Sequence, residues 1–299
     1  MKALLAPLEE LADYEEIRKN RTKENGMIQI AGCVNTQKIH LICGLGNGCE
    51  YKLVIFADEE KAKKAYEEYM LFGEAVYLYP ARDLLFYYAD IKGKTLTAKR
   101  MEVLRAISEK RDKDPVTVIT TMDAFLDGII SPEEIRKSRI HITGEDTVDL
   151  TRLEQELATL GYERESQIEM PGQFAVRGGI IDVFPLSEEM PVRIELWGDE
   201  IDSIRTFDVE SQRSVENISE ITIYPASENC GKKGNPVSFL EYFPRNKTLL
   251  FYDEPHRLQE MAETVETEYF ESLRNRIDAG LEKANSEDLQ VFQTKDIIG

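Results

Sequence analysis

The chain has 299 residues, a length that predicts two or three domains rather than one. Its formal net charge is -19, from 37 basic against 56 acidic residues. This balance opposes a role in binding duplex DNA, because nonspecific DNA affinity comes from Lys and Arg side chains that neutralise phosphates. Four cysteines without CxxC pairing argue against a zinc site and predict free thiols in a reducing compartment.

No apolar run approaches the length of a membrane span, and the first twelve residues lack the sustained apolar core of a signal peptide. We therefore expect a cytoplasmic protein that has no membrane partner. The three histidines are scattered, without a nucleophile or a metal-ligand set around them. We predict no catalytic centre and no metal site in this chain.

The first part of the chain alternates between strand and helix patterns. It opens with apolar residues at helical spacing over residues 4–18. Such β-α-β-α alternation predicts a mainly parallel sheet that is covered by helices. The expected strands are residues 27–31, 52–57, 75–79 and 116–120, and the expected helices are residues 36–45, 59–71, 97–110 and 122–127.

The pattern changes near residue 139. Residues 140–142 predict a strand, and residues 149–160 predict a helix with leucines spaced for packing. Residues 169–214 are the most regularly patterned part of the chain and alternate with a period of two. The glycine pair at residues 178–179 predicts a bulge or a close approach of the backbone. We expect an antiparallel meander with one packed side and one open side.

Three side chains can meet on the open side of this meander. Successive side chains of a strand point to opposite faces, so Arg193 and Trp197 share the outer face, and Arg177 can join them. Trp and Arg are enriched among the few residues that dominate binding energy at interfaces. The alternative is that Trp197 covers the sheet edge and that both arginines pair with neighbouring acids such as Glu195.

The last part of the chain predicts a return to the first sheet. Residues 228–236 have the composition of a linker, and an apolar strand and a long Glu-rich helix follow. We therefore predict an α/β protein in three segments. Residues 1–138 begin a domain, residues 139–227 form an inserted α+β domain, and residues 228–299 complete the first domain and end in a tail.

Near the start of the chain, a segment has the spacing of a phosphate-binding loop, but two of its essential residues are replaced. Gly32 and Lys38 fit the pattern GxxxxGK followed by Ser or Thr. Gln37 replaces the second glycine, and Ile39 replaces the hydroxyl residue that would hold magnesium. An isoleucine cannot bind magnesium, so we interpret this loop as vestigial.

A second segment resembles the motif with which ATPases bind magnesium and position water. Asp253 and Glu254 follow an apolar strand, as that motif requires. The alternative is that these acids cap the next helix, which has Pro255 in its first turn. Together with the altered loop, the segment predicts an ATPase site that no longer works and no cofactor bound by this chain.

The words PGQFAVRGGIIDVFP, VRIELWGDEIDSIRTFD and ESQRS resemble the second domain of the UvrB-like module in bacterial transcription-repair coupling factors (Mfd). The excision-repair protein UvrB is similar too, but it typically has an acid where this chain has Gly179. The resemblance implies that Arg177, Arg193 and Trp197 contact UvrA. The family more often has Phe in place of Trp197.

The same resemblance implies a fold and a function. It covers about residues 28–262 and implies a degenerate P-loop NTPase-like sheet domain that an α+β domain interrupts. The implied function is an N-terminal module without ATPase activity that binds UvrA and recruits nucleotide excision repair to stalled RNA polymerase. ATP, magnesium, the polymerase and DNA would be bound by other parts of a longer protein, a DNA translocase, whose carboxy-terminal part could mask the UvrA face.

The alternative function is a divergent UvrB-like ATPase that acts on damaged DNA through Lys38 and Asp253. The aromatic residues 86–88 could stack on bases, and UvrB grips DNA with a tyrosine-rich hairpin nearby. Here, residues 89–94 are too short for such a hairpin. We therefore expect these aromatic side chains to pack inside the protein.

Overall fold

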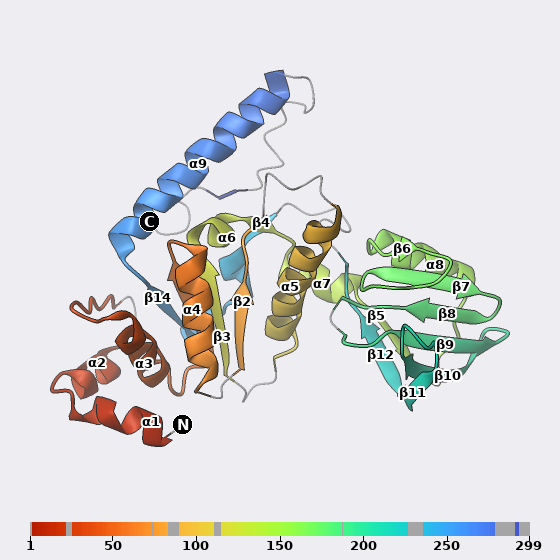
Figure 1. Ribbon diagram of the computed structural model, residues 1–299, viewed down its shortest axis with the longest axis horizontal. Coiled ribbons are helices and arrows are strands. Elements are labelled where there is room, and N and C mark those ends of the chain that lie inside the picture. The colour runs from red at the N-terminus through yellow and green to blue at the C-terminus, as the bar shows by residue number, and fades with distance from the viewer. Residues whose placement is uncertain are drawn as a thin grey trace.

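The computed structural model describes residues 2–21, 26–72, 75–82, 90–110, 115–186, 188–226, 236–278 and 291–292. The aromatic residues 86–88 and most of the expected linker, residues 228–235, lie outside this part of the chain. Figure 1 shows a parallel sheet flanked by helices, and a second sheet set to one side of it. The protein is therefore α/β, with a parallel four-stranded sheet and an inserted, mostly antiparallel six-stranded sheet, as predicted.

The parallel sheet has the strand order β14-β1-β3-β2, and every neighbouring pair is parallel. Its central strands are almost wholly buried because helices cover both faces. One face packs against α3 and α4, and the other packs against α5, α6 and α9. The strands are β1 (Tyr51–Phe56), β2 (Ala75–Tyr79), β3 (Val116–Thr121) and β14 (Thr248–Tyr252).

α3, α4 and α6 begin and end within one residue of the predicted positions. The helix predicted at residues 97–110 is longer than expected: α5 begins at Asp90, and the pattern did not predict its first two turns because residues 90–96 lack regular apolar spacing. α4 starts at a capping aspartate, Asp58, whose side chain accepts a hydrogen bond from the backbone of Lys61. The helices are α1 (Lys2–Leu5), α2 (Tyr14–Asn20), α3 (Asn35–Leu45), α4 (Glu59–Met70), α5 (Asp90–Ser108), α6 (Met122–Leu126), α7 (Pro132–Ser138), α8 (Leu150–Thr159) and α9 (Pro255–Asp278).

Two predictions for the start of the chain are wrong. The single helix expected at residues 4–18 is broken into α1, the 3-10 helix Ala6–Glu10, and α2. Pro7 lies in the first turn of the 3-10 helix, and Leu11 after it is extended, so the α-helical ladder cannot continue. The strand expected at residues 27–31 is absent: these residues are exposed and form no described strand, and Met27 is 91% exposed.

The six-stranded sheet has the order β11-β10-β9-β8-β7-β6 and is antiparallel except for the β6–β7 pair. One face packs against α8, whose leucines join a core with Phe174, Ile194 and Ile204. The strands are β6 (Glu163–Arg164), β7 (Gln173–Arg177), β8 (Ile180–Val183), β9 (Val192–Trp197), β10 (Glu200–Phe207) and β11 (Ser214–Asn217).

Two short antiparallel strand pairs lie between the two large sheets along the chain. β5 (Ile140–Thr143) pairs with β12 (Glu220–Ile223), so the chain enters and leaves the inserted region side by side. β4 (Gly128–Ile129) pairs with β13 (Val237–Ser238) in the same way. In the described part of the chain, no helix is both long enough and apolar enough to cross a membrane.

Polar contacts join the inserted region to α5. Arg105 Nη1 lies 2.6 Å from Glu188 Oε1, and the Tyr224 hydroxyl donates a hydrogen bond to Glu109. Burial, together with this carboxylate, raises the pKa of Tyr224 to about 12. The hydroxyl therefore stays protonated at neutral pH and remains a donor.

Candidate protein-binding site

The face of the six-stranded sheet opposite α8 holds the three predicted contact residues. On β9, Val192 and Ile194 are buried against α8, while Arg193 and Trp197 point the other way. Trp197 is 83% exposed. An exposed tryptophan of this degree contributes almost nothing to the core, so its large apolar surface is free to contact another molecule.

Two tight turns, at residues 178–179 and 198–199, lie at one end of the sheet, next to Arg177 and Trp197. Residues 178–179 form the two-residue connection between β7 and β8, because Arg177 pairs directly with Ile180. Gly178 has a φ of 62°, which favours glycine. At Gly179, an added Cβ would lie 2.8 Å from the carbonyl oxygen of Leu196. The predicted close backbone approach is confirmed.

Both arginines bind one buried carboxylate. Asp182 Oδ1 accepts a hydrogen bond from Arg193 Nε at 2.7 Å, and Asp182 Oδ2 accepts one from Arg193 Nη2 at 2.9 Å. The same Oδ2 accepts a third from Arg177 Nη2 at 2.6 Å. We call these three residues the Asp182 cluster. Charge-assisted and bidentate bonds of this kind are the strong class of protein hydrogen bonds.

The two arginines differ in how much they offer to a partner. The Arg193 side chain is 14% exposed, and its guanidinium stacks on the Phe207 ring at 4.3 Å and donates to Gln212 Oε1 at 3.1 Å. Its bond to Asp182 raises the pKa of Arg193. The Arg177 side chain is 45% exposed. On this face, Arg177 and Trp197 are therefore accessible to a partner, whereas Arg193 mainly supports the arrangement from below the surface.

The sequence did not point to two members of this face, Asp182 and Gln212. The alternative that both arginines pair with neighbouring acids is confirmed, but their partner is Asp182. Glu195 instead binds Arg205 and Ser203. Asp182 occupies the outward position of β8, which its alternation with Ile181 and Val183 could have revealed. Gln212 lies in a turn after β10 and has no strand pattern, so the sequence does not point to it.

The face is not open along its whole length. Ile168, Ala175, Phe184 and Phe207 form a small apolar cluster on it, with Val209 packed against them. The predicted open side is therefore closed by short segments at the end away from Trp197, and the accessible area narrows to the end with the two turns.

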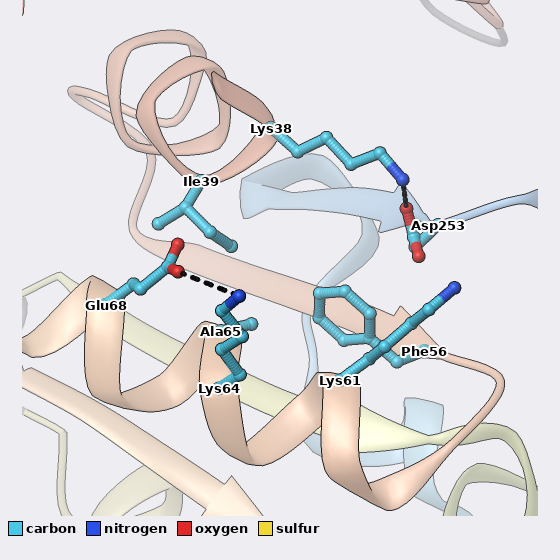
Figure 2. Close-up of a pocket in the computed structure, with 8 residues that line it drawn as sticks. All are labelled: Lys38, Ile39, Phe56, Lys61, Lys64, Ala65, Glu68 and Asp253. Carbon is cyan, nitrogen blue, oxygen red and sulfur yellow. Dashed lines mark hydrogen bonds and ion pairs between the residues drawn. The ribbon is translucent and has the colours of Figure 1, made fainter. Parts of the chain in front are cut away.

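The altered ATPase motifs lie together at the other sheet. Lys38 Nζ is 2.6 Å from Asp253 Oδ1 (Figure 2). The same Nζ is 3.6 Å from Glu254, and Lys61 Nζ is 2.9 Å from Glu254 Oε2. We call these four residues the Lys38 cluster. Burial alone lowers the pKa of Lys38, but the bond to Asp253 and the two acidic charges outweigh it and raise this pKa.

The surroundings of Lys38 leave little room for a ligand. The pocket beside it has a volume of about 30 Å³, against about 300–1,000 Å³ for ordinary ligand sites. Ile39 is buried and lines this pocket with Phe56. Gln37 lies in the first turn of α3 and accepts a hydrogen bond from the backbone of Val34. Gly32 has a φ of 82° in the exposed segment before α3.

In the described part of the chain, no group of three or more His, Cys, Asp or Glu residues could hold a metal ion. Asp253 and Glu254, which the sequence places in a magnesium motif, both face lysines instead. Their charges are thereby compensated within the protein.

Known proteins resemble the chain in the same regions. A family model described as the UvrB interaction domain matches residues 140–229, which include the whole six-stranded sheet and the Asp182 cluster. A transcription-repair-coupling factor of Bacillus subtilis (strain 168) is 29% identical over 271 residues, which are 71% of this chain and 22% of that protein. The chain is homologous to a region of the transcription-repair-coupling factors and contains a UvrB interaction domain.

Other coupling factors match over a shorter length. Those of Staphylococcus aureus (strain bovine RF122 / ET3-1) and Staphylococcus haemolyticus (strain JCSC1435) are 36% and 38% identical over 156 residues, about half of this chain and 13% of each relative. The chain thus spans less than a quarter of the length of the coupling factors it matches.

Proposed function

We propose that this chain is the N-terminal UvrB-like module of a transcription-repair-coupling factor, and that it binds UvrA to bring nucleotide excision repair to stalled RNA polymerase. The observation that carries the proposal is the exposed pair Arg177 and Trp197 at one end of a rigid sheet, inside the segment that matches the UvrB interaction domain. Arg and Trp are the residue types that most often dominate interface energetics.

The chemistry of the face defines what it would bind. Among the described residues, Asp182 is the one partner of the Arg177 guanidinium, and it engages only Nη2. The other nitrogens of Arg177 are left to bind a carboxylate of UvrA. Trp197 would cover an apolar patch beside that carboxylate. Arg193 would contribute positive charge from beneath.

The proposal includes a division of the chain. Residues 1–138 and 228–299 would make one interrupted, degenerate NTPase-like domain, and residues 139–227 would make the UvrA-binding domain. The loss of ATPase activity is supported by Ile39 at the hydroxyl position, by the bond between Lys38 and Asp253, and by the small pocket beside them. ATP, magnesium, DNA and RNA polymerase would be bound by other parts of the whole translocase, which could also mask the face.

Calorimetric titration of the chain with UvrA tests the proposal. The variants are Arg177→Glu, Trp197→Ala, and the matched control Arg152→Glu, which makes the same charge reversal on α8, the helix on the opposite side of the sheet. Loss of one good anchor costs about 2 kcal/mol or more, which corresponds to about thirtyfold weaker binding.

We expect the wild type and the control to bind alike and each site variant to bind far more weakly. If the wild type does not bind UvrA, the proposed function is wrong. If it binds and all variants bind equally, UvrA uses another surface.

A further inference from the structure

We propose that Asp182 is a positioning residue: a buried carboxylate that fixes Arg177 and Arg193 in one arrangement and thereby sets the affinity of the face for UvrA without touching it. This inference rests on the proposed function. Its starting point is the burial of the Asp182 side chain, which is 1% exposed. A partner docked on this face cannot reach it.

The sheet register puts Asp182 between the two arginines. Asp182 on β8 lies directly opposite Arg193 on β9 and opposite Ala175 on β7. Arg177 is two residues beyond Ala175, so it is a diagonal neighbour of Asp182 on the same face. The carboxylate thus lies on the middle strand and collects one guanidinium from each side.

The Asp182 cluster has a net positive charge that a partner can bind. Two guanidinium groups share one carboxylate, and Oδ2 accepts from both. The shared oxygen fixes the separation of two like charges that would otherwise repel each other. A buried carboxylate is tolerated only when it is paired and hydrogen-bonded, and here three bonds of 2.6–2.9 Å satisfy it.

A second device holds Arg193 from the other side. Gln212 has a φ of 59°, a left-handed conformation that is uncommon for a residue other than glycine. Its backbone N–H donates to Asp208 at 2.8 Å, its side-chain amide donates to Val209 at 2.8 Å, and its Oε1 faces Arg193. Arg193 is therefore fixed at several points, and less side-chain entropy remains to be lost when a partner binds.

The decisive experiment is a double-mutant cycle for UvrA affinity. The variants are Asp182→Asn, Arg177→Ala and their combination. Asparagine keeps the shape but removes the charge, so we expect about tenfold weaker binding, mainly through faster dissociation. In the Arg177→Ala background, the same substitution should change the affinity by less than about threefold, because residues of one hydrogen-bonded network are not additive.

Glu154→Gln is the matched control. It makes the same change of net charge within the same domain and also removes the partner of an arginine, Arg164, but it lies on α8, which packs against the opposite face of the sheet. We expect its affinity to equal that of the wild type. An equal loss in Glu154→Gln and Asp182→Asn would assign the effect to net charge and overturn the positioning role.

A second variant and a second readout keep the test valid if Asp182→Asn folds poorly. Gln212→Gly retains the left-handed backbone but removes one bond to Arg193, and about threefold weaker binding is expected for a single lost hydrogen bond. NMR of the arginine Nε–H groups reports the arrangement directly. Arg193 Nε–H should exchange slowly in the wild type and rapidly in Asp182→Asn.

The outcomes separate this inference from the proposed function. If the wild type fails to bind UvrA, the function is wrong whatever the NMR result. If it binds and Asp182→Asn binds equally well, or loses the same factor with and without Arg177, then Asp182 does not act through that arginine. Unchanged exchange of Arg193 Nε–H in Asp182→Asn would also overturn the inference.

Discussion

The Lys38 cluster and the Asp182 cluster are built from the same kinds of charged bonds but differ in balance. In the first, two lysines face two acids, and Arg257, which also lies near Glu254, is balanced by Asp58. In the second, two arginines share one acid. A balanced cluster uses up its charge inside the protein, whereas an unbalanced one retains charge that a partner can use. The number of opposite charges around each charged group, rather than the presence of an ion pair, therefore separates a structural contact from a binding face.

The clusters also differ in what they connect. Lys38 and Asp253 are far apart in sequence, and their bond ties α3 to the end of β14. The Asp182 cluster joins neighbouring strands that the backbone already holds. The first therefore contributes to tertiary structure, and the second arranges side chains on a frame that exists without it.

The largest expected effect is a difference in stability between variants of the two arginines of the Asp182 cluster. Arg193→Ala leaves the buried Asp182 with one partner, so we expect a loss of about 3 kcal/mol in the free energy of unfolding. Arg177→Ala, whose side chain is 45% exposed, should cost less than about 1 kcal/mol. Urea denaturation followed by circular dichroism measures both. Equal losses would refute the division into a supporting and an accessible arginine.

The next effect tests whether the Lys38 cluster is purely structural. Lys38→Met removes the bond to Asp253, whose side chain is 9% exposed, and we expect a loss of about 1.5 kcal/mol in the free energy of unfolding. Lys63→Met on the exposed side of α4 is the matched control and should be near neutral.

The same variants bear on the alternative ATPase. Affinity for UvrA should be unchanged in Lys38→Met, and calorimetry should find no saturable ATP binding in either the variant or the wild type. Magnesium-dependent ATP binding that Lys38→Met abolishes would show that this site is functional after all.

The smallest effect is a dependence on pH. The hydrogen bond from Lys61, with the nearby positive charges, lowers the pKa of Glu254 below its ordinary value of 4.5. Its contribution to stability is therefore complete above that value and is lost as the pH falls through the lowered pKa. The difference in melting temperature between the wild type and Glu254→Gln should shrink below about pH 4.5. A difference that is constant down to about pH 3 would contradict the assignment.

The spacing of apolar residues predicted most of the fold, because it follows which side chains of each helix or strand are buried. Continuous apolar runs such as residues 52–57 became the central strands of a parallel sheet, and alternation over residues 192–197 became a half-buried strand. The segment at residues 27–31 is equally apolar, yet no described strand pairs with it. Pairing depends on a partner elsewhere in the chain, and a local pattern does not contain that information.

The candidate site shows the same limit at the level of side chains. The alternation of residues predicted that Arg177, Arg193 and Trp197 share one face, because successive side chains of a strand point to opposite faces. It did not reveal that Asp182 binds both arginines, because cross-strand partners depend on the register between strands. Gln212 owes its place to a turn, which has no period at all.

The neck formed by β5 and β12 has a consequence for the architecture of longer proteins that contain this segment. Ile140 and Ile223 are cross-strand neighbours, so the chain enters the inserted region about 5 Å from the point where it leaves that region. The two crossings of the chain into and out of the inserted region are therefore as close together as the two strands of a hairpin. Removing the inserted region would leave the hydrogen bonds of the parallel sheet intact and would break the contacts of Arg105 with Glu188 and of Glu109 with Tyr224.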